Sequence, residues 1–143
     1  MTEAEITDLC LGNRDAAAFA LAYLAYCHCV DDLVDRDNDA LCSQDHVIRT
    51  QMEMFFALSR NPFYLQNRDG LLALMLQGFL AWGDSMKWQH SGDESKVHDA
   101  DVVKGQYHEV LFHVALIVGG VEHARKVTSK FRSYDHEPNN VKT

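Results

Sequence analysis

The stretch from Arg14 to about Asp37 contains neither proline nor glycine, and through Val30 its residues are apolar on nearly every face of a helix. A helix that is apolar all round is a buried, central helix. The whole chain of 143 residues contains only two prolines and eight glycines, too few for the many turns of an all-β fold. The sequence therefore predicts an all-α protein built around one long central helix.

Start and stop signals divide the rest of the chain into further helices. We expect a short helix opened by a capping box of Thr2 and Glu5, long helices at about 43–61, 71–89 and 99–118, and a short basic helix at about 121–131. Either Ser43 or Asp39 is expected to cap the first of these three long helices. The polar residues 90–98 are expected to form a loop, and Gly119-Gly120 to end the fourth long helix. The expected architecture is a bundle of four long helices plus short ones, with a domain at 1–133 and a flexible tail at 134–143.

In the second long helix, apolar residues are expected to form a single stripe that faces the core. They are Val47, Ile48, Met52, Met54, Phe55, Phe56 and Leu58.

The net charge and the cysteines indicate which binding partners and which cellular compartment to expect. The 13 basic and 21 acidic residues give a net charge of −8, which argues against nucleic acid or an anionic membrane surface as a partner. No run of about 18 uncharged apolar residues predicts a membrane span. The four cysteines and the polar, acidic first residues, which do not resemble a signal peptide, predict reduced thiols and a cytoplasmic protein.

Two features favour a homo-oligomer. The helices at 14–37 and 99–118 are both apolar all round, which is unusual in a small monomeric bundle because each helix there normally keeps one wet face. A basic segment near the end of the chain also offers an electrostatic partner for the aspartates of a second copy. Its residues are Arg125, Lys126, Lys130 and Arg132.

An acidic cluster follows the apolar part of the central helix. At about 100° per residue, His28, Asp31, Asp32 and Asp35 share one helix face. Carboxylates one turn apart repel one another, so this face calls for a positive partner, and Mg²⁺ or Mn²⁺ with oxygen ligands is the usual one. The alternative is a solvated helix end whose acids bind nothing.

The segment from Tyr26 to Asp35, YCHCVDDLVD, resembles the first aspartate-rich motif, DDxxD, of the class I isoprenoid synthases. The resemblance implies that Asp31 and Asp35 are Mg²⁺ ligands holding the diphosphate of a prenyl substrate, with Asp32 as an outer partner. That family carries a second acidic motif on a facing helix. The closest matches here are Asp84 with Ser85, and Asp101 with Glu109.

The same cluster also resembles the acidic motifs of the all-α nucleotide pyrophosphatases, which carry glutamates in place of these aspartates. Those chains are near this length and assemble as dimers or tetramers. Both resemblances imply the same chemistry, in which Mg²⁺ bridges helix carboxylates to a diphosphate-containing small molecule.

Four further residues are candidates for the same site. Glu109 lies one turn before His113, and a hydrogen bond between them would either satisfy a core histidine or arrange a general base. Lys87 and Lys104 are the helix-borne cations best placed to meet a phosphate, and His28, His108 and His113 are expected to face the interior. The competing hypothesis is a non-enzymatic helical interaction or accessory protein whose acidic cluster is structural.

Overall fold

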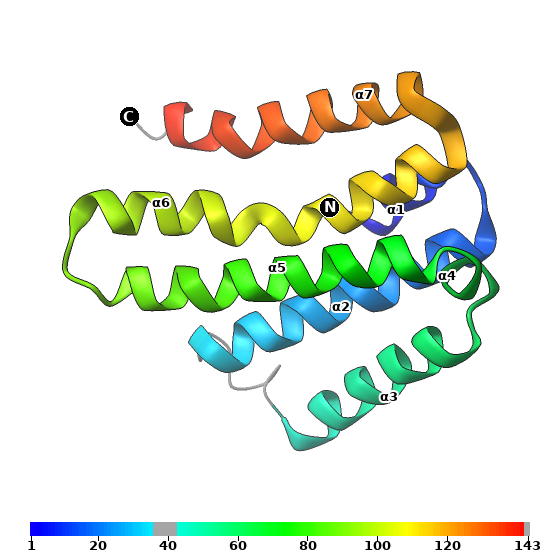
Figure 1. Ribbon diagram of the computed structural model, residues 1–143, viewed down its shortest axis with the longest axis horizontal. Helices are drawn as coiled ribbons and strands as arrows, with labels where there is room; N and C mark the ends of the chain where they lie inside the picture. Colours follow the sequence, from blue (N-terminus) through cyan, green and yellow to red (C-terminus); the bar gives the residue numbers. More distant parts are fainter. Residues whose placement is uncertain (36–42, 142–143) are drawn as a thin grey trace.

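The computed structural model describes the backbone of residues 1–35 and 43–141 and the side chains of residues 1–33 and 43–132. All regular elements in this range are helical, which confirms the all-α class (Figure 1). No helix there is both long enough and apolar enough to cross a membrane. The elements are α1 (Glu3–Leu9), α2 (Arg14–Asp35), α3 (Gln44–Arg60), α4 (Pro62–Gln66), α5 (Arg68–Gln89), α6 (Glu94–Lys104), the 3₁₀ turn η1 (Gly105–His108) and α7 (Glu109–Val141).

Several helix ends in the first half of the chain lie where the sequence predicts them, although α5 begins at Arg68, three residues before its predicted start. The Thr2 hydroxyl accepts a hydrogen bond from the Glu5 amide at 3.1 Å, and the Glu5 carboxylate accepts one from the Thr2 amide at 3.2 Å, which completes the capping box of α1. The Ser43 hydroxyl caps α3, and Asn61 ends it. The short helix α4 was not predicted; Asn61 caps it and Pro62 occupies its first turn.

The predicted loop at 90–98 is correct only for residues 90–93, and the predicted single helix at 99–118 is wrong. Helix α6 begins at Glu94, where the Asp93 carboxylate accepts a hydrogen bond from the Ser95 amide at 3.0 Å. The 3₁₀ turn η1 then interrupts the helix before α7. The Tyr23 hydroxyl holds this turn by donating a hydrogen bond to the Tyr107 carbonyl at 3.0 Å, and α5 packs against it at Gly78, where a Cβ would be in van der Waals contact with the Tyr107 Cα at 3.4 Å.

Helix α7 is bent at Gly120, whose φ of 80° and ψ of −175° are not helical. This confirms that Gly119-Gly120 ends the fourth long helix. The bend divides α7 into a first arm (109–119) and a second arm (121–141) that runs back over the first in Figure 1. The second arm extends past the predicted end at 131, and the flexibility of 134–143 stays a prediction. The His123 ring lies 2.7 Å from the Leu9 carbonyl, which ties the second arm to α1.

Helix α2 is the central helix, as predicted, and packs against α1, α3, α4 and α7. Phe19 and Tyr23 on α2 are fully buried. The ring of Phe19 stacks on Tyr64 of α4 with centroids 5.2 Å apart, and the Phe63 ring lies 6.5 Å away. Helices α5 and α6 form an antiparallel hairpin beside α2 in Figure 1, and the Phe79 ring of α5 meets Tyr26 of α2 edge to face.

The core stripe predicted for α3 is only partly correct. Helix α2 covers the side of α3 that carries Met54 and Ala57, which are 5% and 7% exposed. The predicted core residues Ile48, Met52, Phe55 and Phe56 lie on the opposite side and are 59–70% exposed. Because α3 is apolar on two faces, its periodicity does not determine which face packs on α2. We call these four residues the outer face of α3.

Candidate functional site

The predicted site residues Asp31 and Lys104 meet between α2 and α6. The Lys104 ammonium lies 2.7 Å from Asp31 Oδ1, and the two side chains are 26% and 35% exposed. Oδ1 itself is shielded from solvent and accepts no well-aligned hydrogen bond from the described part of the chain. The two groups therefore form a short ion pair whose geometry is poor for a hydrogen bond. As a result, the buried Oδ1 lacks the hydrogen bond that a buried carboxylate oxygen normally accepts.

Aromatic side chains form one wall beside this ion pair. The ammonium of Lys104 lies 5.9 Å from the ring centroid of Trp82, whose ring stacks against Tyr107 with centroids 6.2 Å apart. The ring of His108 lies 4.0 Å from that of Tyr107. Trp82 is 5% exposed, so the wall lowers the local dielectric and strengthens the attraction between Asp31 and a cation.

Among the other predicted metal ligands, those whose side chains the structure describes are not gathered into a metal site. Asp32 is half-buried and has its own interactions, and the side chain of Asp35 lies outside the described residues. Asp84 and Asp101, from the two candidate second motifs, are exposed. Among the side chains described, no group of three or more histidines, cysteines, aspartates or glutamates is arranged to hold a metal ion.

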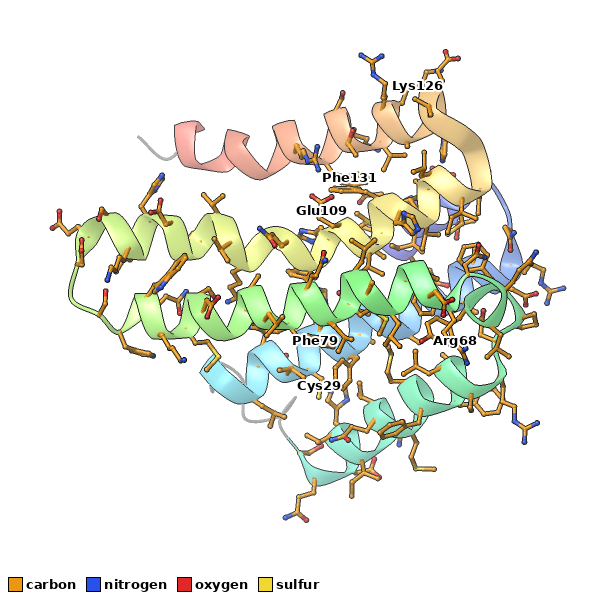
Figure 2. The ribbon with its side chains drawn as sticks, in the orientation of Figure 1. Cys29, Arg68, Phe79, Glu109, Lys126 and Phe131 are labelled. Carbon is orange, nitrogen blue, oxygen red and sulfur yellow. The ribbon has the colours of Figure 1, made fainter. Side chains whose placement is uncertain are left out.

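Glu109 and His113 do not form the expected hydrogen bond. Glu109 Oε1 instead accepts from Arg132 of the second arm of α7 at 2.7 Å, and the Arg132 guanidinium also lies 5.1 Å from the Phe112 ring centroid. Figure 2 shows Glu109 and Phe131 between the two arms of α7. The ion pair between Glu109 of the first arm and Arg132 of the second arm therefore links the two arms of α7.

His113 is half-buried at a different place in the fold. It lines a cavity of about 310 Å³ with Asn67, Arg68 and Gly70 at the start of α5, and its Nε2 would lie 3.1 Å from a Cβ at Gly70. Figure 2 places Arg68 at that end of α5. Among the described residues, neither this cavity nor a hydrogen bond connects His113 to the Asp31–Lys104 pair.

Of the remaining predictions for single residues, some are confirmed and others are wrong. Lys87 is exposed near the end of α5, so it is free to move but is not fixed at the site. His28 is exposed, so its predicted interior position is wrong, whereas His108 is half-buried as expected. The sequence did not single out Trp82 as part of a site, because its spacing marked it only as a core residue.

Two buried thiols give stability a dependence on pH. Burial raises the pKa of Cys10 from 9.0 to about 11 and that of Cys27 from 9.0 to about 12. Below pH 9 both thiols are protonated in the folded and unfolded states and their ionisation contributes nothing. From about pH 9 to pH 11 the unfolded thiols ionise first, so stability falls as pH rises.

We therefore expect Cys27→Ala to flatten the decline of melting temperature measured between about pH 9 and pH 11. One thiol contributes at most about 1.4 kcal/mol per pH unit. If the melting temperatures of the parent and the variant fell equally steeply with pH over this range, the prediction would be wrong.

Comparisons of the chain with protein-family models, with curated proteins and with solved structures find no match.

Proposed function

We propose that the aspartate-rich end of α2 binds a diphosphate group together with Mg²⁺ or Mn²⁺. The observation that carries this proposal is the state of Asp31 Oδ1, which is shielded from solvent, lacks a well-aligned hydrogen bond and is approached by an ammonium. A buried carboxylate oxygen is stabilised by a cation, and the cation that Oδ1 has in the structure is the Lys104 ammonium at 2.7 Å, so a metal ion would bind here by replacing that ammonium.

The metal in this proposal arrives with the diphosphate. Mg²⁺ is commonly held by one or two carboxylates and by substrate phosphates, with waters completing its coordination. Asp31 and Asp32 on α2 suffice for that role, although they do not form a closed metal site of their own. The Mg²⁺ would supply positive charge between the carboxylates and the diphosphate.

Lys104 has a defined part in this proposal. In the structure its ammonium neutralises Asp31 from the α6 side. When a metal ion takes that position, the ammonium is released over a short distance and can pair with a phosphate oxygen. Lys104 thus exchanges one anion for another, while Trp82 beside it limits where the ammonium can move.

The second candidate function is that of a non-enzymatic interaction protein. The observation that favours it is the outer face of α3, where four large apolar side chains are 59–70% exposed. In this case the Lys104–Asp31 ion pair is a structural link between α2 and α6, and the acidic cluster binds no ligand.

A thermal-unfolding experiment separates the two functions. With Mg²⁺ and inorganic pyrophosphate present, we expect the melting temperature of the parent protein to rise, because ligand at about 100 times its Kd stabilises the folded state by about 2.7 kcal/mol. Asp31→Asn should abolish the rise. The matched control Asp84→Asn alters an exposed aspartate on α5 and should keep it.

Lys104→Gln provides the sharper arm of the same experiment. Removing the ammonium should strengthen binding of Mn²⁺ alone, since Asp31 loses its resident cation, and weaken binding of pyrophosphate. If the parent shows no response to metal or pyrophosphate and Lys104→Gln only lowers its melting temperature, the pair is structural and the diphosphate proposal is wrong.

A further inference from the structure

The outer face of α3 is an apolar surface that no described part of the chain covers. Its residues Ile48, Met52, Phe55 and Phe56 are 59%, 66%, 67% and 70% exposed. Their spacing of four, three and one residues forms a stripe along one side of the helix. Figure 1 shows α3 at the edge of the molecule beside α2. The exposures of these four residues place the stripe on the side of α3 that faces away from α2.

Charged residues beside the stripe differ between the two ends of the helix. At about 100° per residue, Asp45, Arg49 and Arg60 follow the same edge of the stripe. Asp45 lies in the first turn and Arg60 in the last turn of α3. The Asp45 carboxylate pairs with Arg49 at 2.9 Å, but both side chains remain highly exposed, at 81% and 69%, so this pair is available for further contacts.

From this arrangement we infer that the outer face of α3 binds the same face of a second copy of this chain, with the two α3 helices antiparallel about a twofold axis. The axis passes through the centre of the stripe, between Met52 and Phe55. Asp45 of each copy then lies opposite Arg60 of the other, on the same edge of the interface. Parallel packing would instead keep Asp45 and Arg60 at opposite ends of the interface, so neither copy's Asp45 would lie near the other's Arg60.

Charge and area both favour a second copy over an unrelated partner. In a twofold interface the same surface patch of both copies is in contact. When one copy is turned end to end, each charge on the patch should therefore meet an opposite charge on the other copy. The antiparallel order also opposes the two helix dipoles favourably. Four side chains of this size and exposure present on the order of 500 Å², the apolar centre of a standard interface of about 800 Å² per partner.

The inference does not depend on the function of Asp31, and its test uses neither metal nor diphosphate. We expect sedimentation of the full chain to give twice the mass of one chain at micromolar concentrations. Phe56→Glu should raise the dimer dissociation constant at least about 100-fold, since a large aromatic side chain is lost and a charge is placed in the apolar stripe of both copies. The matched control Leu80→Glu alters a side chain of α5 that is 71% exposed and should leave the constant unchanged.

A charge exchange then tests the antiparallel order. Asp45→Arg and Arg60→Asp should each weaken the dimer, and the double variant should restore it, because each new arginine again lies opposite a new aspartate. All these residues are exposed, and circular dichroism checks that the variants remain folded. A parent that is monomeric at every concentration, an equal effect of Leu80→Glu and Phe56→Glu, or a double variant weaker than both single variants would overturn the inference.

Discussion

Replacing Phe19 with alanine is expected to lower the free energy of unfolding by about 3–5 kcal/mol. Phe19, in the second turn of α2, is 0% exposed, and its ring contacts Tyr23 on the same helix and both Phe63 and Tyr64 on α4. Truncation removes the buried ring and leaves a cavity between two helices. This loss is a large part of the 5–15 kcal/mol that stabilises a typical domain.

Urea unfolding measures this effect as a lower midpoint with an unchanged slope. The control Leu80→Ala removes a side chain that is 71% exposed, and its effect should stay within about 0.5 kcal/mol. A small effect of Phe19→Ala, similar to that of the control, would show that the aromatic contacts between α2 and α4 do not form the centre of the core.

Replacing Asn61 with alanine is expected to cost about 2–4 kcal/mol, from the loss of a helix cap and of a buried hydrogen bond. Asn61 is 9% exposed. Its Oδ1 accepts from the Tyr64 amide at 2.9 Å, and its Nδ2 donates to the Asp15 carbonyl at 2.9 Å. One side chain therefore starts α4 and links it to the beginning of α2.

Two further variants separate these contributions in the same denaturation measurement. Asn61→Ser keeps a capping hydroxyl but is too short to reach Asp15, so it should recover only part of the loss. Asn67→Ala is the matched control, because the Asn67 side chain donates to the Phe63 carbonyl but does not cap α5. If Asn61→Ala cost no more than Asn67→Ala, the link to Asp15 would be energetically unimportant.

Local signals predicted the helix boundaries best where a cap or a breaker stands at the junction. The capping box of Thr2 and Glu5, the cap at Ser43 and the bend at Gly120 are all read from one or two residues. The cap at Asp93 is an equally local signal for the start of α6, but the polar character of 90–98 concealed it. The 3₁₀ turn η1 is instead held by the hydrogen bond from Tyr23, a residue distant in sequence.

The site was predictable in its residue types but not in its pairing. The sequence indicated that the aspartates need a positive partner and that Lys104 is a helix-borne cation. It did not indicate that α6 would place Lys104 on Asp31, because no local pattern links two helices separated by three others. The same limit explains Glu109: its one-turn spacing to His113 was visible, whereas Arg132 reaches it only through the bend in α7.

The outer face of α3 shows a different limit. Apolar periodicity predicts that a face will be covered, but it does not say whether the same chain covers it. Met54 meets α2, while Phe55 and Phe56, the next residues along the helix, are left for another surface. The expectation of a homo-oligomer thus stays a prediction, and it now concerns α3 instead of the two helices that are apolar all round.

Calorimetric titration of Mg²⁺ with inorganic pyrophosphate into the parent protein, Asp31→Asn and Asp84→Asn tests the central proposal most directly. The proposal predicts saturable binding to the parent and to Asp84→Asn, and none to Asp31→Asn, whose helical content should be unchanged. Binding of equal affinity to the parent and to Asp31→Asn, or no binding to the parent, would contradict it.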